Sequence, residues 1–254
     1  MNLELPIGAH ARYKSRSQQA RVSTEPWAAA NLFCPNCPAP RLEPTDSNTQ
    51  AIDFVCARCE ETFQLKSQGH FIGRKIVDAA YSAMMRALEG DRAPNLFALH
   101  YDSERWRVEN LILIPRFSIS TSAIEKRKPL GPNARRAGWV GCNIVLDLVP
   151  DSARIIILSD GEASRPSDVR ARYRHLRPLA NLSVATRGWT LDVLNVVRSL
   201  GREEFSLDDV YTFAGQLARL HPANRHIRPK IRQQLQILRD LGFVKFLGGG
   251  RYRR

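Results

Sequence analysis

The chain has 254 residues, of which 43% are hydrophobic, and this is enough for one large or two modest globular domains. No apolar run reaches the length that crosses a membrane, and the N-terminus lacks the hydrophobic stretch of a signal peptide, so we expect a cytoplasmic protein without a membrane partner. The formal net charge of +13 makes nucleic acid the natural polyanionic partner, because neutralising phosphates releases their counterions.

The first predicted element is a short helix from Thr24 to Ala30, with Thr24 as its N-cap and Pro26 in its first turn. Two Cys-x-x-Cys pairs follow, with eighteen residues between them: Cys34, Cys37, Cys56 and Cys59. This spacing is typical of a zinc site, and we expect the zinc to be structural because four thiolate ligands leave no position for water. Disulfide bonds are the alternative, which a cytoplasmic location disfavours.

An acid and a lysine flank the second cysteine pair. Asp53 precedes it, and a predicted strand with Gln64 and Lys66 follows. Because side chains alternate along a strand, Gln64 and Lys66 share one face, and Phe63 and Leu65 point into the core. Asp53 and the Gln64 carbonyl could bind a divalent metal ion, while Lys66 could orient or deprotonate water and stabilise charge on a phosphate. The alternative is an ordinary exposed strand face, because this pattern alone has low specificity.

The pattern over residues 76–158 predicts a helix followed by several strands. Apolar residues recur at helical spacing over residues 76–88. Strand-like apolar runs occupy residues 96–101, 111–114, 144–149 and 155–158. We therefore expect a sheet flanked by helices up to about residue 180. Cys142 precedes one of the apolar runs, so we interpret it as a buried small hydrophobic residue and not as a metal ligand.

The character of the chain changes near residues 181–188, after which we predict three helices and a hairpin. Thr190 would cap the first helix, which ends at Gly201. Ser206 would cap the second helix, with Asp209 completing a variant of the capping box. Three helices followed by a basic hairpin describe a winged helix, whose third helix enters the major groove while the wing contacts the DNA backbone.

The third helix and the hairpin carry the candidate DNA-binding residues. The helix has Pro229 in its first turn and runs to about residue 241, and between Arg225 and Arg254 there are nine Lys or Arg residues and one acid. Arg and Gln are the side chains that make bidentate contacts to guanine and adenine. A solvated amphipathic interaction domain is the alternative. The candidates are Arg225, Lys230, Arg232, Gln233 and Gln236 in the helix region and Arg251 and Arg253 in the hairpin.

Short segments along the whole chain match one known family in register. They are YKS with SQ at residues 13–18, CPNC at 34–37, LKS at 65–67, RKPL at 127–130, ARRAGW at 134–139, GCNI at 141–144, RGWT at 187–190 and IRQQLQ at 231–236. On these segments the chain resembles the DpnI-like methyl-dependent restriction endonucleases, which are part of the PD-(D/E)XK nuclease superfamily.

The resemblance implies an α+β fold: a PD-(D/E)XK nuclease domain with an inserted four-cysteine zinc site over residues 1–183, then a winged-helix DNA-binding domain over residues 184–254. It also implies a type II (type IIM) enzyme that uses Mg²⁺ or Mn²⁺ to cleave duplex DNA at GATC sites carrying N6-methyladenine. The residues in the family's catalytic positions are Asp53, Gln64 and Lys66, and Asp53 and Gln64 would hold the magnesium ion. We expect a monomer in solution.

Gln64 departs from the family, which has a glutamate at this position. The change removes one negative charge from the metal site. The alternative function is therefore a protein that binds methyladenine DNA with weakened or lost nuclease activity. A zinc-containing transcription regulator of other ancestry is a third hypothesis, and it is disfavoured because Asp53 and Lys66 keep the strand spacing of a nuclease.

Reading a methyl group requires an apolar or aromatic contact in the major groove. Trp139 is the candidate in the nuclease domain, because it follows the cations Arg135 and Arg136 and could lie beside a bound duplex. The alternative is a tryptophan of the core, since large aromatic side chains are usually buried. We expect Trp189, in the winged-helix region, to pack against the start of its helix.

Overall fold

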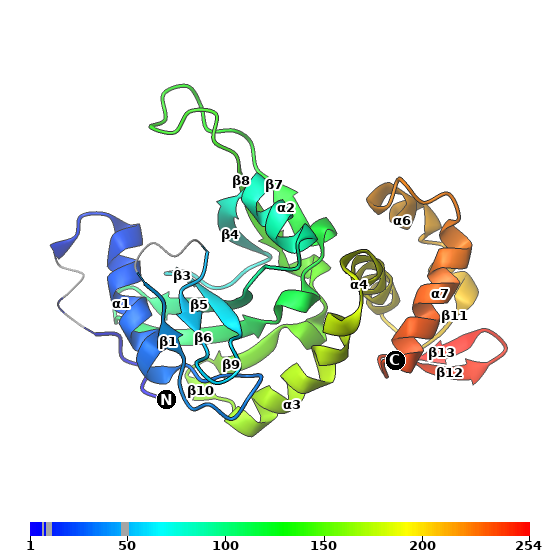
Figure 1. Cartoon of the computed structure of the whole chain (residues 1–254), viewed down its shortest axis with the longest axis horizontal. Helices are drawn as coiled ribbons and strands as arrows, with labels where there is room; N and C mark the ends of the chain where they lie inside the picture. Colours follow the sequence, from blue (N-terminus) through cyan, green and yellow to red (C-terminus); the bar gives the residue numbers. More distant parts are fainter. Residues whose placement is uncertain (7, 9–11, 47–50) are drawn as a thin grey trace.

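Strand β5 is the centre of the first domain, because the run Leu96 to Leu99 is buried on both faces. Figure 1 shows the computed structural model, which describes residues 1–6, 8, 12–46 and 51–254. Among these residues β5 belongs to a seven-stranded mixed sheet, parallel to β3 and antiparallel to β6. The sheet order is β1 (Glu43–Pro44), β2 (Phe54–Val55), β3 (Thr62–Gln68), β5 (Asn95–Asp102), β6 (Arg107–Ile114), β9 (Ile155–Ser159) and β10 (Glu162–Ala163).

A small second sheet and three helices complete the first domain. The small sheet has the order β4 (Lys75–Ala80), β8 (Gly141–Val145) and β7 (Ile124–Lys126). Helix α1 (Arg16–Asn31) packs on β3, where the hydroxyl groups of Thr24 and Ser67 share a hydrogen bond of 3.1 Å. Helix α2 (Tyr81–Glu89) follows β4, and α3 (Pro166–Leu176) packs on β9. The cysteine and Asp53 region thus leads directly into a strand of the central sheet.

Two of the predicted helices begin at other residues in the structure than expected. The first helix begins at Arg16, eight residues before Thr24, whose hydroxyl donates to the Ala20 carbonyl within the helix and does not cap it. One face of α1, which includes Trp27, is buried against the domain core. This burial stabilises the longer helix even though Pro26 lies inside it. Over residues 76–88 only the second half is helical. Ile76 and Asp78 are buried while their neighbours are exposed, which is the alternation of a strand.

The strand predictions over residues 96–101, 111–114 and 155–158 are confirmed by β5, β6 and β9. The run over residues 144–149 is strand only to Val145, where β8 ends and a 3₁₀ turn begins. Cys142 is fully buried and lies outside the group of four clustered cysteines, as predicted, and burial raises the pKa of its thiol to about 11.

The second domain has its own core and is helical with a small sheet, in agreement with the winged-helix prediction. Residues 184–254, all of which are described, contain four helices where three were predicted: α4 (Val184–Ser199), α5 (Leu207–Tyr211), α6 (Ala214–Leu220) and α7 (Ile227–Asp240). Strands β11 (Glu204–Ser206), β13 (Arg251–Arg253) and β12 (Lys245–Gly248) form an antiparallel sheet in that order. The wing is the turn between β12 and β13.

Of the two helix caps predicted in this domain, one is confirmed and the other is wrong. Ser206 and Asp209 form a complete capping box at the start of α5. Thr190, in contrast, lies inside α4, which begins at Val184 with Ser183 as its cap. The Thr190 hydroxyl contacts Gln234 of α7 over 2.7 Å, so this residue joins two helices. Trp189 is buried and stacks on His221 with ring centroids 3.7 Å apart.

Polar contacts of α4 join the two domains. The buried Arg187 reaches Asp91 of the first domain over 2.5 Å. Ser122 donates to the buried Asp192 over 2.5 Å, and Asn195 donates to the Leu148 carbonyl over 2.6 Å. None of the helices in the described part of the chain is both long and apolar enough to span a membrane.

Candidate active site and DNA-binding surface

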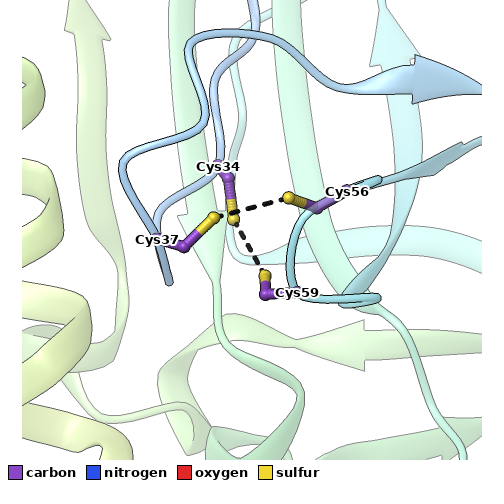
Figure 2. Close-up of side chains that lie close together, drawn as sticks. All are labelled: Cys34, Cys37, Cys56 and Cys59. Atoms are coloured by element: carbon purple, nitrogen blue, oxygen red, sulfur yellow. Dashed lines mark hydrogen bonds between the residues drawn. The ribbon is translucent and has the colours of Figure 1, made fainter.

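The four clustered cysteines have the geometry of a tetrahedral metal site. The Sγ atoms of Cys34 and Cys59 lie 3.5 Å apart, as do those of Cys37 and Cys56, and all four lie within 4.8 Å of one another (Figure 2). A tetrahedron with zinc–sulfur bonds of about 2.3 Å has edges of about 3.8 Å. Burial raises the pKa of the Cys34 thiol, so its thiolate requires a cation nearby. The cluster therefore fits a closed, structural zinc site.

Hydrogen bonds hold both cysteine loops in place. Arg170 of α3 donates from Nε to the carbonyls of Cys34 and Cys37 over 3.0 and 2.9 Å, and from an Nη atom to the Ala39 carbonyl over 3.1 Å. The Cys56 amide donates to the Glu61 carbonyl over 2.9 Å. The second loop connects β2 to β3, so the sulfur cluster fixes the start of the strand that carries Gln64 and Lys66.

The three residues in the catalytic positions lie at the start of β2 and on the adjoining strand β3. Asp53 stands just before β2, and its Oδ2 accepts a hydrogen bond from the Leu65 amide over 2.7 Å. This contact places the Asp53 carboxylate at the residue between Gln64 and Lys66. Gln64 is buried at 8% exposure, whereas the Lys66 side chain is 27% exposed. An ordinary exposed strand face would not bury the glutamine.

A cavity of about 580 Å³ lies beside these residues. Its lining includes Ile52, Gln64, Asp78, Arg136 and Trp139. It therefore brings the candidate methyl-reading tryptophan to the same hollow as the candidate metal ligand Gln64. Asp53 directly follows the lining residue Ile52 in the chain.

Asp78 is the residue of this site that the sequence analysis missed. It lies on β4 of the small sheet, and its Oδ1 is 2.6 Å from the Lys66 Nζ. An acid that alternates with Ile76 on the buried face of a strand is the signal that could have identified it. The assignment of residues 76–88 to one helix concealed this alternation.

Trp139 lies at the end of a basic loop that connects β7 and β8. In Figure 1 this loop extends well away from the rest of the first domain. Residues 127–140 contain four Lys or Arg residues and no acid. The indole packs against Gly141, where a Cβ atom would lie only 2.7 Å from the ring, and the Arg136 guanidinium lies 4.9 Å from the ring centroid. Trp139 is half-buried beside the cavity and not part of the described core.

Helix α7 presents the predicted polar face to solvent. Ile231, Leu235 and Leu238 are fully buried. The exposed candidates are Arg225, Arg232, Gln233 and Gln236, and Lys230 is half-buried. Lys230 donates from Nζ to Gln233 Oε1 over 2.8 Å, so these two side chains lie together on the first turns of the helix.

The two wing arginines have different surroundings. Arg251 and Arg253 lie on the same face of β13 and are both exposed. Arg253 is bound by Glu204 of β11, with its Nη2 2.5 Å and its Nε 3.0 Å from the same carboxylate oxygen. Arg251 forms no ion pair within the part of the chain that the structure describes. Arg251 is therefore the better placed of the two to bind a phosphate.

Two family models match the chain. One, described as DpnI, Dam-replacing family, matches residues 1–182. The other, described as DpnI_C, Dam-replacing HTH domain, matches residues 185–254. The first match covers the domain with the mixed sheet and the four-cysteine cluster. The second match covers the helical second domain.

The sulfur cluster yields a prediction about stability. Cys56→Ser should lower the zinc content and the melting temperature, because one thiolate of the buried tetrahedron is lost. Cys142→Ser is the matched control, since Cys142 is equally buried but lies outside the cluster. Metal analysis and thermal melts of both purified variants measure these effects. A folded wild-type protein that contains no zinc would contradict the assignment.

The second domain yields a prediction about DNA recognition. Arg232→Ala or Gln233→Ala should cost about 1–3 kcal/mol of discrimination between the preferred DNA site and other sequences, because these side chains can reach base edges. Arg251→Ala should weaken binding to all DNA and reduce the slope of log affinity against log salt by about one. Binding titrations at several salt concentrations measure both effects.

Arg253→Ala is the matched control for the wing, because this arginine is already bound to Glu204. It should weaken DNA binding less than Arg251→Ala. Equal losses of affinity on specific and unspecific sites for all the variants would remove the assignment of α7 as the reading helix.

Proposed function

The chain belongs to the DpnI, or Dam-replacing, family of restriction-type nucleases, and we propose that it is a methyl-dependent restriction endonuclease. It cleaves duplex DNA at GATC sites that carry N6-methyladenine, by metal-dependent hydrolysis of the phosphodiester bond. Residues 1–183 form the nuclease and residues 184–254 the winged helix. The observation that carries this proposal is that the two family models together match almost the whole chain.

The candidate active site offers the groups that this reaction requires. Asp53 and the Gln64 carbonyl would hold Mg²⁺ or Mn²⁺, whose bound water supplies the nucleophile and whose charge stabilises the phosphate. Lys66 lies on the same side of β3 as Gln64. Its positive charge stabilises the negative charge that develops on the phosphate during cleavage. The buried sulfur cluster fixes the strand and takes no part in the chemistry.

DNA reading is divided between the two domains in this proposal. The polar face of α7 enters the major groove, and Arg251 contacts the backbone. In the nuclease domain, the basic β7–β8 loop brings Trp139 to the N6-methyl group. The position of the indole beside the cavity that Gln64 lines supports this role, because a base held there would lie near a candidate catalytic residue.

A protein that binds methyladenine DNA and has lost cleavage is the second candidate function. The observation that favours it is Gln64, which removes a negative charge from the metal site. Under this alternative α7 and Trp139 still read the DNA, but neither Mg²⁺ nor Mn²⁺ supports cutting.

Catalysis yields the test of the proposed function. Asp53→Ala and Lys66→Ala should each abolish cleavage of methylated duplex, because each removes a charge from the reacting centre, and both should leave DNA binding largely intact. Gln64→Glu should retain or raise the activity supported by magnesium, because a carboxylate is a stronger ligand than an amide for this ion. Cleavage assays measure the activity of each variant, and binding titrations measure its affinity for DNA.

Loss of cutting in Gln64→Glu, with normal cutting by the wild type, would show that the site depends on the amide. Absence of cutting by the wild type with either metal, with methylated DNA still bound, would support the second candidate function.

Methyl reading yields a separate prediction. Trp139→Ala should reduce cleavage of methylated sites by about tenfold, equivalent to about 1.4 kcal/mol, because the apolar contact with the methyl group is lost. Leu130→Ala is the matched control, since Leu130 is exposed in the same loop and is absent from the cavity lining. Cleavage rates and thermal melts of both variants test the prediction. Collapse of the Trp139→Ala fold would place this side chain in the core instead.

A further inference from the structure

A buried ion pair connects the catalytic strand to the small sheet. The Asp78 side chain has no exposed surface, and its Oδ1 lies 2.6 Å from the Nζ of Lys66. Asp78 comes from β4 and Lys66 from β3, so the pair joins two different sheets. We propose that Asp78 is a positioning residue of the active site, which holds the Lys66 ammonium group where it meets the scissile phosphate. This inference rests on the proposed nuclease function.

Burial makes this contact stronger than the other lysine pair of the small sheet. Removing a carboxylate from water is costly unless a cation or several hydrogen bonds compensate it. For Asp78, Lys66 is that cation, and the Ala79 amide donates to the same Oδ1 over 2.7 Å. Lys75 and Glu125 of the same sheet also lie 2.7 Å apart, but their side chains are 48% and 41% exposed. Water screens that exposed pair, so it restrains its lysine much less.

The long side chain of a lysine explains why the active site needs this contact. Lys66 has a flexible four-carbon stem, and its side chain is 27% exposed, so its outer end can move unless a partner holds it. Asp53 is anchored to the backbone through the Leu65 amide, and Gln64 is buried. Asp78 gives Lys66 the same degree of order, which a positioned catalytic group requires.

Asp78 also supplies negative charge near the position where Gln64 has none. Gln64 and Asp78 line the same cavity, and Oδ2 of Asp78 is a buried atom without a hydrogen-bond partner among the described residues. The candidate site thus contains two carboxylates, one contacting the Leu65 backbone and one contacting the Lys66 side chain.

Asp78→Asn tests the role of the carboxylate in cleavage. This variant keeps the size of the side chain and removes its charge. The single-turnover cleavage rate on methylated duplex should fall by about a hundredfold, as expected for a displaced catalytic group, while the affinity for DNA changes by less than about twofold. Glu125→Gln, which breaks the exposed pair of the same sheet, should cleave at the wild-type rate.

Thermal melts test the ion pair without any measurement of activity. Lys66→Met leaves the Asp78 carboxylate buried without its cation, so it should lower the melting temperature. Adding Asp78→Asn to Lys66→Met should recover part of that loss, whereas Asp78→Asn alone should lower the melting temperature. Asp78→Asn is thus expected to lower the melting temperature when Lys66 is present and to raise it when Lys66 is replaced by Met. The effect changes sign in this way only if the two side chains interact in solution.

Three outcomes would overturn the inference. The first is an Asp78→Asn variant that cleaves as fast as Glu125→Gln, which would leave the proposed nuclease function intact. The second is an equal effect of Asp78→Asn on the melting temperature in the Lys66 and Lys66→Met backgrounds. The third is an Asp78→Asn variant that is unfolded in both backgrounds, because the carboxylate would then serve the fold. A wild-type protein that does not cut would instead remove the proposed function, and this inference with it.

Discussion

The structure depends most on the cluster of four sulfur atoms at the start of strand β3. Cys56 and Cys59 lie in the loop between β2 and β3, and Cys34 and Cys37 lie just beyond α1. A metal ion bound by these two segments would fix the loop relative to the helix that packs on β3. Arg170 adds hydrogen bonds from α3 to three carbonyls of the first segment. The strand with the candidate catalytic residues is therefore held at its origin and against both of its neighbours, β2 and β5.

The electrostatic arrangement around Lys66 follows from this fixed strand. On β3 the Leu65 amide donates to the Asp53 carboxylate, and Lys66 contacts Asp78 from the small sheet. The Lys66 ammonium thus contacts the Asp78 carboxylate, while the Asp53 carboxylate is held at the backbone of the neighbouring residue. The glutamine therefore removes charge from a site that still contains two acids. This is a physical reason to expect that the substitution changes the metal preference of the site more than it changes its architecture.

Local signals in the sequence predicted those parts of the structure that local chemistry determines. The cysteine spacing predicted the cluster, the capping box at Ser206 was confirmed, and the apolar positions of α7 are buried. Sequence reasoning failed where tertiary packing overrides local preference. Thr190 looks like a cap, but its hydroxyl contacts Gln234 on a helix distant in sequence. Asp78 was missed for a different reason, because the assignment of residues 76–88 to one helix concealed the strand alternation that buries it.

Under the proposed function, this chain cuts DNA only when adenine is methylated. The most direct measurement incubates the wild-type protein with two duplexes that differ only in N6-methylation of the adenines in one GATC site, first with Mg²⁺ and then with Mn²⁺. We expect cleavage of the methylated duplex with at least one of these ions and no cleavage of its unmethylated counterpart. Equal cutting of both duplexes, or cutting of neither with both ions, would contradict this expectation.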